Sequence, residues 1–138
     1  MLGGIFEEIS SSAVIANNTV TGNGATATCS GASTLYFCGI NGISISDSHD
    51  VQVYGNTLSG NLNAVAAYNG HSMVNGLYNI SVHDNTMSGG TTGIQTYPLI
   101  ANAYSTSHWY NNTYQASQQF FWASGETNLA GWTAAGQS

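Results

Sequence analysis

The chain carries an internal repeat centred on an Asn-Thr pair, and this repeat restricts the folds that the sequence can adopt. Successive Asn residues of the pair lie 38, 29 and 27 positions apart, and an apolar residue in a second short run recurs at steps of 30, 29 and 27. The pairs are Asn18-Thr19, Asn56-Thr57, Asn85-Thr86 and Asn112-Thr113, and the apolar residues are Leu35, Val65, Ile94 and Phe121. Two landmarks that share a period of about 28 residues indicate stacked repeats, because one such unit cannot bury its apolar face alone.

Within each unit the apolar residues alternate along the chain with a period of two. Val51 and Val53 precede the second Asn-Thr pair, and Ile80 and Val82 precede the third. This spacing is typical of strands, whereas a helical repeat needs a period of 3.6 residues. The sequence therefore predicts that each unit forms two or three short strands separated by Gly, Ser and Asn turns. The sequence predicts an all-β solenoid of about four to five coils, forming one domain over residues 1–138.

Segment 42–61, GISISDSHDVQVYGNTLSGN, resembles the repeats of right-handed parallel β-helix proteins, as in the pectate lyase superfamily and related carbohydrate-active proteins. The resemblance begins near Gly4 and extends to segment 120–138, which is similar to the coil that closes the C-terminal end of such domains. It implies a right-handed parallel β-helix, and we expect the chain to be the C-terminal part of a longer solenoid. The resemblance specifies the fold rather than a function, because β-helices carry several activities.

The repeated Asn residues have a structural interpretation in this fold. Asn tolerates left-handed backbone geometry and bonds to its own neighbouring backbone, so it suits a corner between strands. At one position of successive coils the amides would donate and accept along the solenoid axis, at a spacing of roughly 4.8 Å. We therefore predict an internal ladder made of Asn18, Asn56, Asn85 and Asn112.

Both cysteines lie near the longest step of the repeat, with Cys29 in the inserted stretch and Cys38 at the end of the next expected strand. A Cys29–Cys38 disulfide would attach this insertion to the solenoid. The alternative is a buried free Cys38 beside an unpaired Cys29. The disulfide would suit an oxidising compartment, so we expect a secreted protein that is extracellular or at the cell surface.

The chain contains no Lys and no Arg, and its formal net charge is −6. Without basic side chains a protein cannot neutralise phosphates, which argues against nucleic acid as a partner. The same lack argues against docking on anionic lipid, and no apolar run is long enough to span a membrane. Polysaccharide lyases of the resembled class generally use Arg or Lys in their sites, so a standard site of that kind cannot be complete here.

Acid–base chemistry would have to use carboxylates and imidazoles. The candidates are Asp47 and Asp50, which share a predicted turn, and the adjacent pair His83 and Asp84. Such groups could serve a glycosidase-like reaction, although short Asp-rich turns on a solenoid are commonly only solvated corners. Calcium could bind Asp47 and Asp50 with backbone carbonyls, whereas the His residues have no zinc-type spacing, so we predict no required cofactor and no defined metal site.

An outward row of rings is the best candidate for ligand contact. Tyr54, His83 and Tyr110 each lie two residues before a repeated Asn, and strand alternation directs them away from the core. Polar residues that could bond to sugar hydroxyls lie beside the row, namely Gln52, Asp84 and Asn111. Aromatic rings with such neighbours can bind sugars, and the competing interpretation is that the rings only stabilise the sheet.

These observations favour a secreted β-helix module, non-catalytic by itself, that contacts polysaccharide or acts as a structural spacer. A first alternative is a fragment of a polysaccharide lyase or glycoside hydrolase. A second alternative is a self-assembling extracellular fibre subunit, whose open coils would associate end to end.

Overall fold

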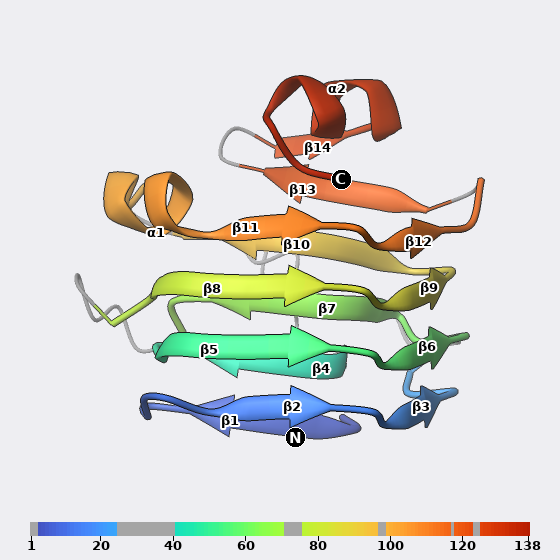
Figure 1. The fold of residues 1–138 in the computed structure, drawn as a ribbon, viewed down its shortest axis with the longest axis horizontal. Helices are drawn as coiled ribbons and strands as arrows, with labels where there is room; N and C mark the ends of the chain where they lie inside the picture. Colours follow the sequence, from blue (N-terminus) through green and yellow to red (C-terminus); the bar gives the residue numbers. More distant parts are fainter. Residues whose placement is uncertain (1–2, 25–40, 71–75, 97–98, 117, 123–124) are drawn as a thin grey trace.

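The computed structural model describes residues 3–24, 41–70, 76–96, 99–116, 118–122 and 125–138 (Figure 1). Its first strands are β1 (Ile5–Glu8), β2 (Val14–Ala16), β3 (Thr19–Thr21), β4 (Asn41–Ser46), β5 (His49–Tyr54), β6 (Thr57–Ser59) and β7 (Asn63–Tyr68). The later strands are β8 (Tyr78–His83), β9 (Thr86–Ser88), β10 (Thr91–Gln95), β11 (His108–Tyr110), β12 (Thr113–Tyr114), β13 (Gln119–Trp122) and β14 (Gly125–Thr127). Two short helices complete the described chain, α1 (Ala101–Thr106) and α2 (Leu129–Ala134).

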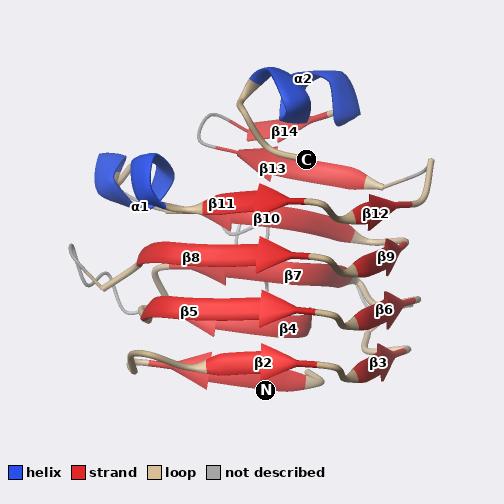
Figure 2. Ribbon diagram, in the orientation of Figure 1, coloured by secondary structure: helices blue, strands red, loops and turns tan. Residues whose placement is uncertain are grey.

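The strands form three sheets, and each of the first four coils contributes one strand to each sheet (Figures 1 and 2). The sheet orders are β1-β4-β7-β10-β13-β14, β11-β8-β5-β2 and β12-β9-β6-β3. All pairs among the described strands are parallel except β13–β14, which is antiparallel. Parallel neighbours therefore have strand numbers that differ by three, as expected when successive coils of a solenoid stack. This confirms the predicted parallel β-solenoid of four to five coils.

The register explains why the apolar residues alternate with a period of two. Val51 pairs with Ile80, and Val53 pairs with both Ile15 and Val82, so each apolar column runs along the interior of the stack. Val51, Val53, Ile80 and Val82 are all at most 1% exposed. Burial of such side chains contributes roughly 1.5–3 kcal/mol each, so the repeated apolar positions are what hold the coils together.

The four Asn residues of the repeated pair occupy one column at the corner between two sheets. Asn18 Nδ2 donates to Asn56 Oδ1 (3.0 Å), Asn56 Nδ2 to Asn85 Oδ1 (2.9 Å), and Asn85 Nδ2 to Asn112 Oδ1 (3.0 Å). The residue before each of them has a left-handed φ of 54–64°. This conformation turns the chain from one sheet to the next, and these four turn residues are Asn17, Gly55, Asp84 and Asn111.

A second Asn column, which sequence analysis did not find, lies at the next corner. Asn23 Nδ2 donates to Asn61 Oδ1 (2.9 Å), and Asn61 Nδ2 donates to the Val20 carbonyl (2.9 Å). In the following coil the equivalent position is Gly90, where a Cβ would lie 2.6 Å from the Asn61 carbonyl oxygen. The sequence feature that could have revealed this second column is the Gly-Asn pair that recurs at 22–23 and 60–61. In both cases the Asn lies five residues after an Asn of the first column.

The C-terminal end of the core is covered by aromatic side chains and by α2. Trp109 and Trp132 are fully buried, with ring centroids 5.7 Å apart, and Trp132 stacks on Phe120 at 4.9 Å. Segment 120–138, which resembled a closing coil, therefore folds mainly as the end of β13, an antiparallel β14 and the covering helix α2. Figure 1 shows α2 at the opposite end of the stack from β1.

The predicted disulfide is not tested by the structure. Cys29 and Cys38 both lie in residues 25–40, outside the described residues, so the disulfide remains a prediction. Among the described helices, none is long and apolar enough to cross a membrane.

Candidate functional site

The candidate site lies on the outer face of the sheet formed by β2, β5, β8 and β11. The register places Tyr54 beside His83, and His83 beside Tyr110. The Tyr54 and His83 rings stack with centroids 5.2 Å apart and planes 13° apart, and the His83 and Tyr110 rings stack at 4.7 Å and 7°. The row that the sequence analysis singled out is therefore one continuous stack of three rings.

This stacking changes how the row can contact a ligand. Both faces of the His83 ring lie against tyrosine rings, so His83 offers its edge rather than its face to solvent. On the first-coil side of Tyr54 the register places Ala16, whose methyl group covers little of a ring face. A sugar can therefore stack on that face of Tyr54, whereas along the rest of the row it meets ring edges and hydroxyl groups.

A second aromatic stack lies at the other end of the same strands. The rings of His49 and Tyr78 are 4.5 Å apart and inclined by 6°. Sequence analysis missed this pair. The two residues lie 29 positions apart, which is one step of the repeat, so a comparison of aromatic positions at that step would have found them.

A polar column separates the two stacks. Gln52 lies between His49 and Tyr54 on β5, and the register continues from Gln52 to Ser81 and to His108. A cavity of about 370 Å³ opens at this column. Its lining residues are Ser12, Ala13, Val14, Asp50, Val51, Gln52, Asn79 and Ser81. The outer face thus combines rings on both sides with hydroxyl and amide groups between them.

Each stack contains a His whose ring is held by the next residue in the chain. His49 Nδ1 lies 2.8 Å from Asp50 Oδ2, and His83 Nδ1 lies 2.7 Å from Asp84 Oδ2. An ionised carboxylate only accepts hydrogen bonds, so Nδ1 carries the proton and Nε2 of a neutral ring is left as an acceptor. Both Asp residues adopt a left-handed φ, near 55°, which allows this contact between neighbours.

The Asp50 carboxylate has two donors. The Asn79 side-chain amide donates to Asp50 Oδ1, and His49 holds Oδ2. These contacts, with that of Asn79 the larger, lower the pKa of Asp50 below its ordinary value of 3.8. Because a lowered folded-state pKa favours the ionised form, its stabilising effect is present above the unfolded pKa and is lost as the pH falls through the folded pKa.

We expect carboxyl NMR titration to give Asp50 a pKa below 3.8, and Asn79→Gly to move it back toward that value. Glycine removes the amide while tolerating the φ of 52° at position 79. An unchanged pKa in this variant would show that the amide does not stabilise the carboxylate.

The other predicted residues take different positions. Asp47 is 3% exposed and accepts a hydrogen bond from Ser46 Oγ (3.0 Å), so it is not on the open face with Asp50. Asp50 accepts a hydrogen bond from Asn79 of the next coil, whereas Asp84 takes the same left-handed turn position, one residue before a repeated Asn, as Gly55 and Asn111. The structure therefore places the Asp50 and Asp84 carboxylates in different columns. Within the described ranges, no three His, Cys, Asp or Glu residues are arranged to hold a metal ion.

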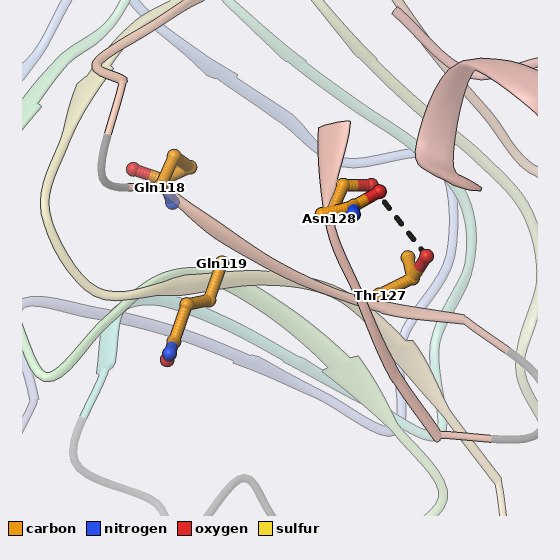
Figure 3. A pocket seen from close by; sticks show the side chains of 4 residues that line it. All are labelled: Gln118, Gln119, Thr127 and Asn128. Atoms are coloured by element: carbon orange, nitrogen blue, oxygen red, sulfur yellow. Dashed lines mark hydrogen bonds between the residues drawn. The ribbon is translucent and has the colours of Figure 1, made fainter. Parts of the chain in front are cut away.

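A second cavity, of about 440 Å³, lies near the C-terminal end between β13 and the end of β14 (Figure 3). Gln118, Gln119, Thr127 and Asn128 line it. Thr127 Oγ1 donates to the Asn128 carbonyl (3.5 Å), and Figure 3 shows the Gln119 side chain directed away from these two residues. The polar groups do not converge on one point, so this cavity is a weaker candidate than the outer face.

No protein-family model, no curated protein and no solved structure matches this chain. The geometry of the outer face and the composition of the chain are therefore the basis for proposing a function.

Proposed function

We propose that this protein is a β-solenoid module that binds a neutral polysaccharide on the outer face of the β2-β5-β8-β11 sheet. The observation that carries the proposal is the pair of aromatic stacks, His49–Tyr78 and Tyr54–His83–Tyr110, on either side of a polar column. Sugar rings present apolar C–H faces and many hydroxyl groups, and this combination suits a surface of rings, amides and hydroxyls.

Binding would divide between two kinds of contact. The first-coil face of Tyr54 would stack on a sugar ring, because only Ala16 lies beside it in register. Gln52 and Ser81 would bond to sugar hydroxyls from the polar column, and the exposed carboxylate of Asp84 would accept from hydroxyl donors. The parallel coils repeat such positions along the axis at roughly 4.8 Å, so an extended chain can contact more than one coil.

The charge of the protein favours a neutral ligand over an acidic one. The chain has no Lys or Arg and a net charge of −6, and Asp50 and Asp84 both lie near the outer face. Uronate carboxylates would meet repulsion and no cationic partner. Binding of a neutral glycan would depend little on salt, because few charge pairs would form.

We also infer that the protein is secreted and related to the carbohydrate-active β-helix proteins that segment 42–61 resembles. The repeat period supports this relation, as does the outer face on which aromatic rings lie beside amide and hydroxyl groups. An enzymatic role would be favoured by His83, whose Nε2 is available as a base while Asp84 holds Nδ1. Product analysis after incubation with neutral and acidic polysaccharides tests that second candidate.

The test of binding is a titration with neutral oligosaccharides and with oligogalacturonate. We expect Tyr54→Ala/Tyr110→Ala to lower the affinity for the neutral ligand roughly tenfold, since it removes the stacking face of Tyr54 and the ring-edge and hydroxyl contacts of Tyr110, at about 0.5–1.5 kcal/mol for an aromatic contact. Tyr54→Phe/Tyr110→Phe keeps the rings and should retain most of the affinity. Leu129→Ala, at a remote residue that is 53% exposed, is the control for nonspecific effects.

Thermal unfolding of each variant separates loss of binding from loss of fold. Equal affinity in the wild type and the folded double alanine variant would exclude the aromatic row as the contact surface. Absence of neutral-glycan binding by the wild type would favour the structural-spacer interpretation instead.

A further inference from the structure

Histidines are the only side chains of this protein that can carry a positive charge, because the sequence contains no Lys and no Arg. There are four His residues, of which His71 lies outside the described residues. The other three are on neighbouring strands, with His49 on β5, His83 on β8 and His108 on β11 (Figure 1). Within the described part of the chain, every side chain that can become cationic therefore belongs to the sheet with the proposed glycan surface.

His108 extends the polar column of this surface. It is in register with Ser81, which is in register with Gln52. His108 is exposed and the next residue, Trp109, is fully buried, so strand alternation directs the imidazole outward. Among the described residues, no carboxylate forms an ion pair with His108. Its protonation therefore adds an unpaired positive charge to the outer face.

The other two histidines can be protonated without leaving their stacks. His83 lies between Tyr54 of β5 and Tyr110 of β11, with ring centroids 5.2 and 4.7 Å away. His49 lies on Tyr78 of β8, with centroids 4.5 Å apart. Because the faces of tyrosine rings attract cations, each stack accommodates an imidazolium. Acidification therefore changes the charge of the surface while keeping its shape.

Protonation reverses the sign of the charge on this face. Its two carboxylates, Asp50 and Asp84, accept from the Nδ1 atoms of His49 and His83. A proton added at each Nε2 makes these two pairs neutral overall, and His108 then contributes one positive charge. Imidazole ordinarily changes charge between about pH 5 and pH 8. The face thus passes from two negative charges to one positive charge across this range.

The other carboxylates do not offset this change. Three of them are on β1 and β14, which belong to another sheet, and Asp47 is 3% exposed. β2 carries no titratable side chain, and α1 carries only Tyr104, which packs on Trp122. The titratable groups that face the three imidazoles are therefore the tyrosines of the two stacks together with Asp50 and Asp84.

We propose that mild acidification makes the outer face of this sheet bind polysaccharides that carry anionic groups, through protonated His49, His83 and His108. The inference rests on the proposed function, because it adds a pH-dependent ligand class to the same surface. At neutral pH the two carboxylates repel anions and the face selects uncharged glycans. At mildly acidic pH the imidazolium N–H groups donate to the anionic groups of the glycan.

The probe is a dextran sulfate oligosaccharide, because its sulfate esters stay ionised throughout and only the protein titrates. Unmodified dextran of the same length is the neutral comparison. Calorimetric titration of the intact protein is carried out at about pH 7.5 and about pH 5, near the two ends of the imidazole range. We expect dextran sulfate to bind roughly tenfold more tightly at the lower pH, since three modest charge contacts are gained at an exposed surface. High salt should remove this gain.

Two substitutions at His108 separate the charge of this face from other effects of pH. His108→Lys carries a fixed positive charge, so it should bind dextran sulfate about threefold more tightly than the wild type at about pH 7.5. His108→Gln is uncharged at both pH values, so its gain on acidification should be about threefold smaller. The control is Glu7→Gln on β1, which raises the net charge equally but on another sheet. It should leave the affinity ratio between the two pH values unchanged.

Equal affinity of the folded wild type for dextran sulfate at both pH values would overturn the inference. A gain that persists in His49→Gln/His83→Gln/His108→Gln, or that Glu7→Gln alters as much as His108→Gln does, would also overturn it, because the charge of the whole protein would then be responsible. Circular dichroism at both pH values checks the fold of each variant. The proposed function is judged separately, by the binding of neutral oligosaccharides at neutral pH, so either proposal can fail without the other.

Discussion

Asn85→Ala is expected to lower the free energy of unfolding by about 3–5 kcal/mol, since it leaves two or three buried groups without partners at about 1–3 kcal/mol each. Asn85 is 1% exposed. Its Oδ1 accepts from the main-chain N and the Nδ2 of Asn56, and its Nδ2 donates to Val53 O, His83 O and Asn112 Oδ1. The Asn56 main-chain N–H would keep no partner in the packed core, and the Val53 and His83 carbonyls would each lose a donor. Urea unfolding monitored by circular dichroism measures the loss.

Thr86→Ala is the matched control, because Thr86 follows Asn85 directly and its side chain is exposed. We expect a change within about 0.5 kcal/mol for this surface position. Similar losses in the two variants would contradict an internal, stabilising ladder. Asn85→Asp separates packing from hydrogen bonding: it keeps the shape but places an oxygen against three acceptors, so it should also destabilise the protein strongly at neutral pH.

Gly93→Ala is expected to be about as damaging, at about 3–5 kcal/mol, because backbone strain and overpacking each cost about 1–3 kcal/mol. Gly93 has a φ of +144°, which L side chains rarely adopt. A Cβ there would lie 2.0 Å from the Phe121 carbonyl oxygen. Since Gly93 pairs with Phe121 between β10 and β13, the substitution would separate the last coil from the stack.

Gly89→Ala is the control for backbone conformation alone. Gly89 has a φ of +81°, and among the described residues no atom lies within 4 Å of the position that a Cβ would take. We expect it to lose only about 1–2 kcal/mol, the cost of a left-handed conformation for a residue with a Cβ. If Gly89→Ala and Gly93→Ala unfold at the same urea concentration, the close approach at Phe121 does not determine the effect.

The sequence was sufficient to predict the coil architecture because each coil repeats the same two requirements. Alternating residues such as Val51 and Val53 must enter the core, and a polar residue such as Asn56 must satisfy the main chain at the corner. Both requirements recur with the period of the repeat. The right-handed sense and the relation to a particular family stay predictions, because the parallel order of strands is compatible with more than one family.

Features that occur in only two coils were harder to predict. The Asn23–Asn61 contact has no third Asn, because the close approach at Gly90 excludes a side chain. The His49–Tyr78 stack joins two different aromatic residue types and therefore does not stand out as a repeat. The covering helix α2 lies outside the repeat altogether, and only its buried Trp132 indicates that it belongs to the core.

The row of Tyr54, His83 and Tyr110 was predictable in position but not in geometry. The offset from the repeated Asn residues gives the column in which each ring lies. Whether a ring faces solvent or its neighbour depends on side-chain torsions that the period does not determine. Because the rings stack on one another, the surfaces left for a ligand are the first-coil face of Tyr54 and the polar column at Gln52 and Ser81.

The most direct test of the proposed function is an amide and side-chain NMR titration of the intact protein with a neutral oligosaccharide. We predict that the resonances of Gln52, Tyr54, Ser81 and His83 shift with one saturable binding curve, while those of Gln118 and Asn128 at the second cavity do not. The same curve is expected at low and high salt, with smaller shifts for oligogalacturonate. Shifts confined to Gln118 and Asn128, or shifts on the outer face caused only by the acidic ligand, would contradict a neutral-glycan surface on this sheet.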